Sequence, residues 1–262
     1  MNISLDEFKV VITGSTGIVG RRIAKAFAAE GARLYLTGQE TASDIGEMAM
    51  AMGASEAKYY CADLSDTGQI LRLCQTIEQD WGGVDVLVNN AGLYPLQPLL
   101  SMSIESWDQV LGINLRTPFL LTKEVARMMI SKKIKGSIVN ISSGAAFRAK
   151  VGHGHYSTSK AGLEMLSKTF ALELAPFGIR VNTVVPGFAP GSVESALPPE
   201  YTKKMVETIP LGRPSGDMDA PAVILFLASS MASFITGTTI VVDGGRSAGV
   251  ITNADRDYLM FL

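Results

Sequence analysis

Tyr156 and Lys160 are the residues whose types and spacing most directly suggest chemistry, since they place a phenol and an ammonium four residues apart. In a helix, residues at this spacing lie on one face, one turn apart. A neighbouring cation favours the phenolate, and a free tyrosine titrates near about 10, so the lysine would help the phenol to transfer protons near neutral pH. The same spacing is also common in exposed helical pairs. Its meaning therefore depends on the rest of the chain.

A glycine-rich turn follows the first expected strand. Residues 9–12 are a β-branched apolar run, Gly14, Gly17 and Gly20 come next, and residues 21–30 have helical periodicity. Strand, glycine turn and helix form the context in which a glycine fingerprint binds a dinucleotide. Glycines let the backbone approach a pyrophosphate, and the start of the helix offers free N–H groups. A plain tight turn is the alternative.

Strands alternate with helices along the rest of the chain. Further apolar runs predict strands at 34–37, 58–61, 84–88, 137–141, 180–185 and 239–242. Periodic segments predict helices at 45–52, 70–81, 106–130, 156–177 and 220–227, of which the one at 106–130 is interrupted by Pro118. Strands that are apolar throughout belong to a parallel sheet that is covered on both faces. This predicts an α/β fold, a doubly wound Rossmann-type parallel sheet of seven strands with helices on both faces, in a single domain spanning 1–262.

Polar and glycine-rich clusters follow these strands at 13–20, 38–40, 62–64, 89–92, 142–144 and 186–187. In doubly wound sheets, ligands bind at the carboxyl ends of the strands. We therefore expect one site, built from all of these clusters.

Composition excludes several other classes of function. Hydrophobic residues make up 47% of the 262 residues, which is enough for a large core, and the net charge is −2 without a basic run longer than two residues. Nucleic acid and anionic membranes are therefore not expected as partners. Cys61 and Cys74 fit neither a disulfide framework nor a metal site, and with only two histidines no metal centre is expected. Without a leader or an apolar run of about 18 residues, we expect a cytoplasmic protein.

The chain resembles the short-chain dehydrogenase/reductase family, in its compact single-domain branch, over nearly all of residues 9–245. The motifs that carry the resemblance are the turn at 13–20, Asp63-Leu64, Asn-Asn-Ala-Gly at 89–92, Asn114, Ser143, Tyr156-x-x-x-Lys160, Pro186-Gly187, 210–214 and 242–245. The resemblance implies an oxidoreductase that transfers a hydride between NAD(P)(H) and a ketone or secondary alcohol of modest size, as a carbonyl reductase does. It also implies a cofactor half at about 1–145, a catalytic and substrate half at about 146–246, and a C-terminal tail at 247–262.

The resemblance assigns roles to four residues of a catalytic tetrad. Tyr156 would be the general acid/base, and Lys160 would lower the pKa of Tyr156 and hold the nicotinamide ribose. Ser143 would hydrogen-bond the substrate oxygen, and Asn114 would anchor a water that links Lys160 to solvent. For Asn114, a helix residue that satisfies backbone groups is the alternative.

The resemblance also implies the ligand contacts. The implied cofactor residues are Gly14, Ser15, Thr16, Gly17, Ile18, Val19, Gly38, Gln39, Asp63, Leu64, Asn90, Ala91, Gly92, Tyr156, Lys160, Pro186, Gly187 and Ala189. The expected substrate contacts are Tyr94, His153 and Phe188, in a pocket whose wall includes the Pro-rich, irregular stretch 188–209. A homotetramer or homodimer is implied, and the apolar tail would pack on a neighbouring subunit.

Three positions depart from the compact branch. The spacing Gly14-x-x-Gly17-x-x-Gly20 resembles the extended branch, and Gly191 stands where the family usually has a threonine, with Ser192 as the nearest hydroxyl. Gly38-Gln39 carries neither the acid typical of NAD binding nor the arginine typical of NADP binding. Because no acid would repel a 2′-phosphate, NADP is slightly favoured, although Glu40 weakens this. A non-catalytic dinucleotide-binding sensor or scaffold, and an epimerase or dehydratase that uses the same tetrad, are the alternative functions.

Overall fold

A computed structural model describes residues 5–41, 43–191 and 199–260 of the chain, and it is built around one parallel sheet. Its strand order is β3-β2-β1-β4-β5-β6-β7, which confirms the predicted seven-stranded, doubly wound sheet. The strands are β1 (Lys9–Ile12), β2 (Arg33–Gly38), β3 (Glu56–Cys61), β4 (Val86–Asn89), β5 (Ser137–Ile141), β6 (Arg180–Pro186) and β7 (Thr239–Val242). The order reverses between β1 and β4, so the carboxyl ends of these two strands form the topological switch point at which such sheets bind ligands.

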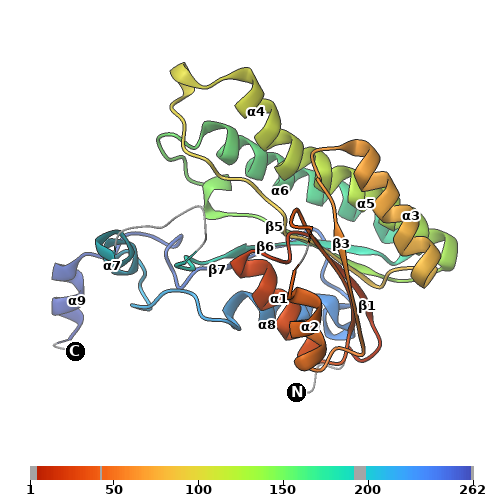
Figure 1. Ribbon diagram of the computed structural model, residues 1–262. Coiled ribbons are helices and arrows are strands. Elements are labelled where there is room, and N and C mark those ends of the chain that lie inside the picture. The colour runs from red at the N-terminus through yellow and green to blue at the C-terminus, as the bar shows by residue number, and fades with distance from the viewer. Residues whose placement is uncertain (1–4, 42, 192–198, 261–262) are drawn as a thin grey trace.

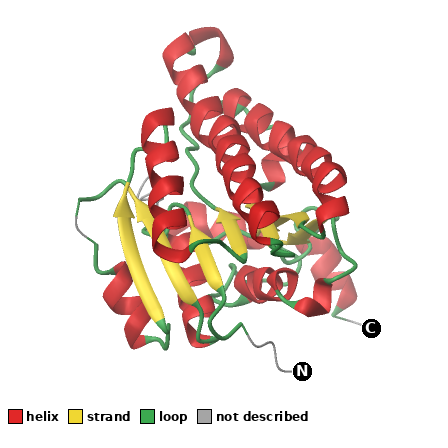
Figure 2. Ribbon diagram, turned by 90° about the vertical axis from the view of Figure 1, so that its right-hand side faces the viewer, coloured by secondary structure: helices red, strands yellow, loops and turns green. Residues whose placement is uncertain are grey.

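Helices cover both faces of the sheet (Figures 1 and 2). One layer contains α1 (Ile18–Ala29), α2 (Ile45–Ala51) and α8 (Asp219–Ala228), and the opposite layer contains α3 (Thr67–Trp81), α4 (Ile104–Leu111), α5 (Thr117–Lys132) and α6 (Gly154–Leu174). Each layer has its own apolar core, because successive strand residues point to opposite faces: Val10 and Ile12 pack under α1, and Val11 packs under α3 and α5. None of the described helices is long and apolar enough to cross a lipid bilayer.

The helix predicted at 106–130 is interrupted. The structure has α4, then one turn of π-helix at Gly112–Arg116, then α5. Pro118 sits in the first turn of α5, where its missing N–H costs no helical hydrogen bond. The Thr117 hydroxyl donates to Gly112 O (3.1 Å) and to Leu64 O (2.6 Å), which ties the junction to the segment after β3. The interruption predicted at Pro118 is therefore present, and it takes the form of a π-helical turn just before that residue.

The stretch predicted as irregular at 188–209 contains a helix, α7 (Pro199–Glu207), while residues 192–198 lie outside the described residues. Near the end of the chain, α9 (Asn253–Leu259) lies beside α7, away from the sheet (Figure 1). The Arg256 guanidinium joins them, since it donates to Glu207 O (3.2 Å), Ile209 O (2.9 Å) and Pro210 O (3.4 Å). These carbonyls follow or end α7 and would otherwise lack helical partners.

Candidate active site

The switch point is held together by hydrogen bonds between the ends of β1 and β4. The Thr13 hydroxyl accepts from Asn90 N (3.0 Å) and Ala91 N (3.1 Å). The Asn90 side chain donates in return to Thr13 O and Gly14 O, both at 2.9 Å. The predicted clusters after these two strands therefore meet, and the segment 90–92 is fixed against the glycine turn.

The glycine turn has two positions that only glycine fits. Gly14 has a φ of +62°, and a Cβ there would lie 2.8 Å from Ala91 Cα. A Cβ on Gly20 would lie 2.2 Å from Gly14 O. Close backbone packing therefore explains both residues, without any need for a ligand.

Gly17 differs, because a Cβ there would meet only Gly14 O, at an ordinary 3.6 Å. Gly17 is the N-cap of α1 and, among the described residues, no side chain caps this helix end; Ile18 and Val19 begin the first turn. Free N–H groups and the positive end of the helix dipole form an anion-binding site. This open cradle fits the pyrophosphate of a dinucleotide.

The ends of β2 and β3 form the expected adenosine side of the site. The Ser15 hydroxyl donates to Thr37 O (3.0 Å), and the Tyr59 hydroxyl donates to Glu40 O (2.7 Å). A Cβ on Gly38 would lie 2.7 Å from the Tyr59 hydroxyl and 2.8 Å from Thr16 Cγ2, so Gly38 keeps these side chains close together. Burial raises the pKa of Tyr59 to about 12, so the phenol stays neutral.

Asp63 and Leu64 serve the local structure as well. Asp63 N donates to Gln69 Oε1 (2.9 Å), and the Asp63 carboxylate accepts from Ser65 N (2.9 Å). Leu64 is buried in the core under α3 and α5. The exposed Cys61 lies at the same edge, where its thiol donates to Gln39 O (3.4 Å).

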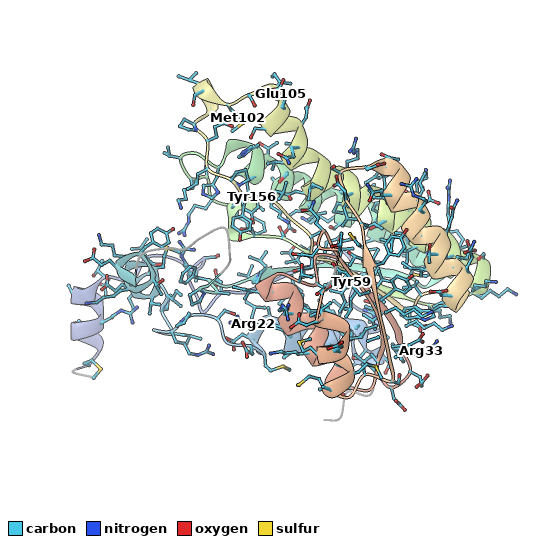
Figure 3. All side chains as sticks on the ribbon, in the orientation of Figure 1. Arg22, Arg33, Tyr59, Met102, Glu105 and Tyr156 are labelled. Atoms are coloured by element: carbon cyan, nitrogen blue, oxygen red, sulfur yellow. The ribbon has the colours of Figure 1, made fainter. Side chains whose placement is uncertain are left out.

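Tyr156 lies in the first turn of α6 and is partly buried, far from Arg33 at the opposite end of the sheet (Figure 3). Its ring is 6.1 Å from that of Tyr94 and 5.8 Å from that of His153, between centroids. Burial raises the pKa of Tyr156, whereas the hydrogen bond between its hydroxyl and Ser143 lowers it. The structure thus brings Ser143, Tyr94 and His153 together around the phenol, as predicted from the sequence.

Lys160 is buried on the same face of α6, with Nζ 5.9 Å from the centroid of the Tyr156 ring. Its ammonium donates to Ile141 O, at 2.8 Å, so the end of β5 fixes its position. Burial lowers the pKa of Lys160 to about 8, and the charge of Glu164 opposes that shift. A Cβ on Gly92 would lie 3.6 Å from this ammonium, so the absence of a side chain there leaves room for it.

Asn114 sits in the π-helical turn, and its side chain holds backbone groups. Oδ1 accepts from Leu93 N (2.8 Å), and Nδ2 donates to Leu93 O (2.8 Å) and to Ser159 Oγ (3.1 Å). Both ends of the amide are therefore engaged in joining the segment after β4 to α6. The predicted contact with a water would need another atom of Asn114, such as its backbone carbonyl oxygen, and stays a prediction.

The end of β6 supplies the last predicted cluster. A Cβ on Gly187 would lie 3.0 Å from Val242 O, a tight contact, so glycine eases the close approach of the ends of β6 and β7. Pro186, Gly187 and Ala189 line a narrow recess that Val19 and Arg22 of α1 close from the other side. Phe188 faces a different cavity with Ile209 and Leu211, and its carbonyl accepts from Ser215 N (2.8 Å). Among the described residues, no group of three or more His, Cys, Asp or Glu is arranged to hold a metal ion.

Comparison with known proteins identifies the family. The family model described as enoyl-(acyl carrier protein) reductase matches residues 14–247. The chain belongs to the short-chain dehydrogenase/reductase family. It is 39% identical to a 3-oxoacyl-(acyl carrier protein) reductase from Aquifex aeolicus, over 94% of this chain and 99% of that protein. Nodulation protein G from Rhizobium meliloti is 35% identical, over 91% of this chain and 96% of its own length.

Solved structures of short-chain dehydrogenase/reductases agree with this assignment. One from Mycobacterium marinum has a TM-score of 0.87 and 29% identity, and covers 94% of this chain and 98% of its own. A protein from Beutenbergia cavernae, assigned as an NAD(P)-dependent gluconate 5-dehydrogenase and solved with NADP bound at low occupancy, has a TM-score of 0.87 and 30% identity, over 94% and 99% of the two chains. The predicted family and the predicted oxidoreductase of ketone or alcohol groups are confirmed.

Proposed function

We propose that the chain is an NADP(H)-dependent carbonyl reductase in which Tyr156 transfers a proton to the oxygen of a ketone. The observation that supports this most strongly is the grouping of the partly buried Ser143 and Tyr156 with the buried Lys160, at the sheet edge that also carries the uncapped start of α1. When bound, the cofactor supplies or accepts the hydride. The protein supplies orientation and the proton.

The two ends of the cofactor would be held by different features. The start of α1 beside Gly17 would bind the pyrophosphate, and Pro186, Gly187 and Ala189 would border the nicotinamide. On the adenosine side, the predicted contacts are Gly38 and Gln39. The carboxylate of Glu40 lies at this edge, 3.5 Å from the Tyr59 hydroxyl and 2.7 Å from the Cβ position of Gly38, and it weakens a preference for NADP. Position 39 itself carries the neutral amide of Gln39, which would not repel a 2′-phosphate. This favours NADP, in line with the NADP in the Beutenbergia protein.

The proton step follows from the surroundings of the phenol. Ser143 would donate a hydrogen bond to the substrate oxygen and place it next to the Tyr156 hydroxyl. Burial makes a charged phenolate costly, so the phenol is held protonated and ready to donate in the direction of ketone reduction. A protonated Lys160 would stabilise the phenolate that forms.

The substrate would enter between Tyr94 and His153, past a basic rim formed by Arg148 and Lys150. Burial lowers the pKa of His153, and the charge of Lys150 lowers it further. Lys150 Nζ donates to the Tyr201 hydroxyl of α7 (3.3 Å), so the rim bridges the two sides of the entrance. A ketone that carries a carboxylate is the class that this rim favours. We further propose a cytoplasmic homotetramer or homodimer, in which the tail at 247–262 contacts a neighbouring subunit.

The test is a screen of NADPH and NADH against cyclic and linear ketones, each acid paired with its methyl ester. We expect NADPH oxidation with the acids, loss of turnover in Tyr156→Phe with NADPH binding retained, and normal activity in Tyr60→Phe on the distant strand β3. A fully active Tyr156→Phe enzyme would refute the role of the phenol. Cofactor that is recycled without net oxidation would instead indicate an epimerase or dehydratase.

A further inference from the structure

Glu164 is a buried carboxylate one helical turn beyond Lys160 on α6. The side chains of Lys160 and Glu164 are only 4% and 7% exposed. Residues at this spacing share one face of a helix, so both point toward the sheet. A charged group is seldom buried unless something compensates it. The position of Glu164 therefore requires an explanation.

The sheet beneath α6 carries a row of polar side chains that makes this burial tolerable. Asn89, Asn140, Thr183 and Thr239 are in register on β4, β5, β6 and β7. Asn89 donates to Asn140 Oδ1 (2.7 Å), and Asn140 donates to the hydroxyl of Ser167 on α6 (2.8 Å). The helix thus meets a polar row at this level of the sheet.

Glu164 forms the end of that row, and its hydrogen bonding is incomplete. The Thr239 hydroxyl donates to Glu164 Oε2. Within the described part of the chain, Glu164 Oε1 and the neighbouring Thr183 Oγ1 have no hydrogen-bond partner. One neutral hydroxyl cannot balance a buried negative charge. A nearby cation would balance this charge.

Lys160 is the buried cation on this face. Its ammonium donates to Ile141 O and forms no direct ion pair with Glu164 within the described residues, so the two charges interact through space rather than through a shared hydrogen bond. The other titratable groups around the ammonium are Tyr156 and His155 on α6, with Tyr94 and His153 facing them from the adjoining loops. Lys168, one turn further along α6, is exposed. Glu164 is thus the buried acid of this group.

We propose that Glu164 is a positioning residue of the catalytic site, whose buried negative charge keeps Lys160 protonated beside Tyr156. Burial alone would favour a neutral lysine. A neutral lysine could not stabilise the phenolate that Tyr156 becomes when it gives up its proton. The inference rests on the proposed roles of Tyr156 and Lys160, and adds a third group behind them.

The sign of the effect follows from the charge. Removing a negative charge destabilises the ammonium and stabilises the phenolate, so the pKa values of Lys160 and Tyr156 both fall. Lys160 bonds to β5 and Glu164 bonds to β7, two strands further across the sheet, so the two charges are separated by roughly 10 Å. At an effective dielectric constant of about 20, the expected shift is about one pH unit. This corresponds to an approximately tenfold change in the ratio of charged to neutral lysine. A purely structural role would lower activity at every pH without moving the midpoint.

The experiment compares Glu164→Gln with Glu173→Gln, which removes an exposed carboxylate from the same helix. The first measurement is the ¹³Cε NMR titration of Lys160 in the cofactor-free protein, assigned with Lys160→Arg. The second is the pH profile of kcat/KM for ketone reduction. We expect both midpoints to fall by about one unit in Glu164→Gln and to stay in place in Glu173→Gln. Thr239→Val, which removes the hydroxyl but keeps the charge, should also leave them in place.

Coincident midpoints in Glu164→Gln and the unsubstituted protein would overturn the inference. If Glu164→Gln does not fold, Glu164→Met, which has a similar length and no charge, is titrated in the same way. The NMR titration does not depend on turnover. An active Tyr156→Phe variant would therefore refute the proposed function separately, whether or not the Lys160 midpoint moves.

Discussion

Alanine at Gly20 should mainly destabilise the fold, whereas alanine at Gly17 should mainly weaken cofactor binding, although both glycines belong to the same turn. At Gly20, the added Cβ would lie 2.2 Å from Gly14 O and 2.8 Å from Ser15 Cα. Both are backbone atoms, which cannot rotate away. Such overpacking costs about 1–3 kcal/mol or more, whereas the gain in helix propensity is only about 1 kcal/mol. We therefore expect Gly20→Ala to destabilise the fold by about 2 kcal/mol.

At Gly17 the space is open, and φ of −71° with ψ of 164° is accessible to alanine. Alanine is a poorer N-cap than glycine, so the free energy of unfolding should fall by less than about 1 kcal/mol. The Cβ would, however, project over the uncapped start of α1. If the pyrophosphate binds there, NADPH should bind at least about tenfold more weakly, which is about 1.4 kcal/mol.

The assays are urea denaturation for stability and NADPH fluorescence for the dissociation constant. Gly46→Ala is the matched control, since Gly46 lies in α2 and a Cβ there would meet nothing within 4 Å. It should leave NADPH binding unchanged and stabilise the fold by up to about 1 kcal/mol. Unchanged NADPH affinity in Gly17→Ala would refute the pyrophosphate cradle, and a fully stable Gly20→Ala would refute the packing of the turn.

Three other predictions follow from burial and charge. Cys61 is exposed, whereas burial raises the pKa of the Cys74 thiol to about 12. A thiol reagent should therefore label only Cys61 in the native protein and both cysteines in urea. Fast labelling of the native Cys61→Ser variant would contradict this. The hydrogen bond with Arg213 lowers the pKa of Asp219 to about 2, so its contribution to stability is present above about pH 4 and is lost as the pH falls toward 2. Because this pair is largely exposed, Asp219→Asn should cost at most about 1 kcal/mol at pH 7 and nothing near pH 2, by urea denaturation at each pH. Asn140→Ala should lower the free energy of unfolding by about 2–4 kcal/mol in the same assay, because the buried amide of Asn89 and the buried hydroxyl of Ser167 each lose their hydrogen bond to Asn140. A loss below about 1 kcal/mol would mean that the polar row beneath α6 rearranges to replace these hydrogen bonds.

Local sequence patterns were sufficient to predict the strands, the glycine turn and the placing of Tyr156 and Lys160 on one face of a helix. Buried parallel strands are continuous apolar runs, and the carboxyl ends of neighbouring strands necessarily meet. Pro118 was sufficient to predict an interruption of the long helix, but not the π-helical turn at Gly112–Arg116, because the Thr117 hydroxyl stabilises that turn through contact with Leu64, which is distant in the sequence.

The hydrogen-bond partners of the residues around Tyr156 and Lys160 could not be predicted from the sequence, because these partners are distant along the chain. Glu164 follows Leu163 in a helix where a lone glutamate would ordinarily face solvent, and its partner Thr239 is 75 residues away. The side chain of Asn114 holds Leu93 and Ser159, while the water that this residue is predicted to anchor stays a prediction. In both cases the residue was visible in the sequence, while its partners were set by the packing of α6 against the sheet and the loops.

The Arg256 contacts connect α9, near the C-terminal end of the chain, to α7, which borders the proposed entrance to the site. Because one guanidinium binds three carbonyls at the end of α7, force or bulk applied at the last residues would be transmitted to the wall of the entrance rather than to the sheet. An affinity tag fused at the C-terminus would therefore disturb substrate selection before it disturbed folding. Preparations for kinetic work should carry the tag at the other end of the chain.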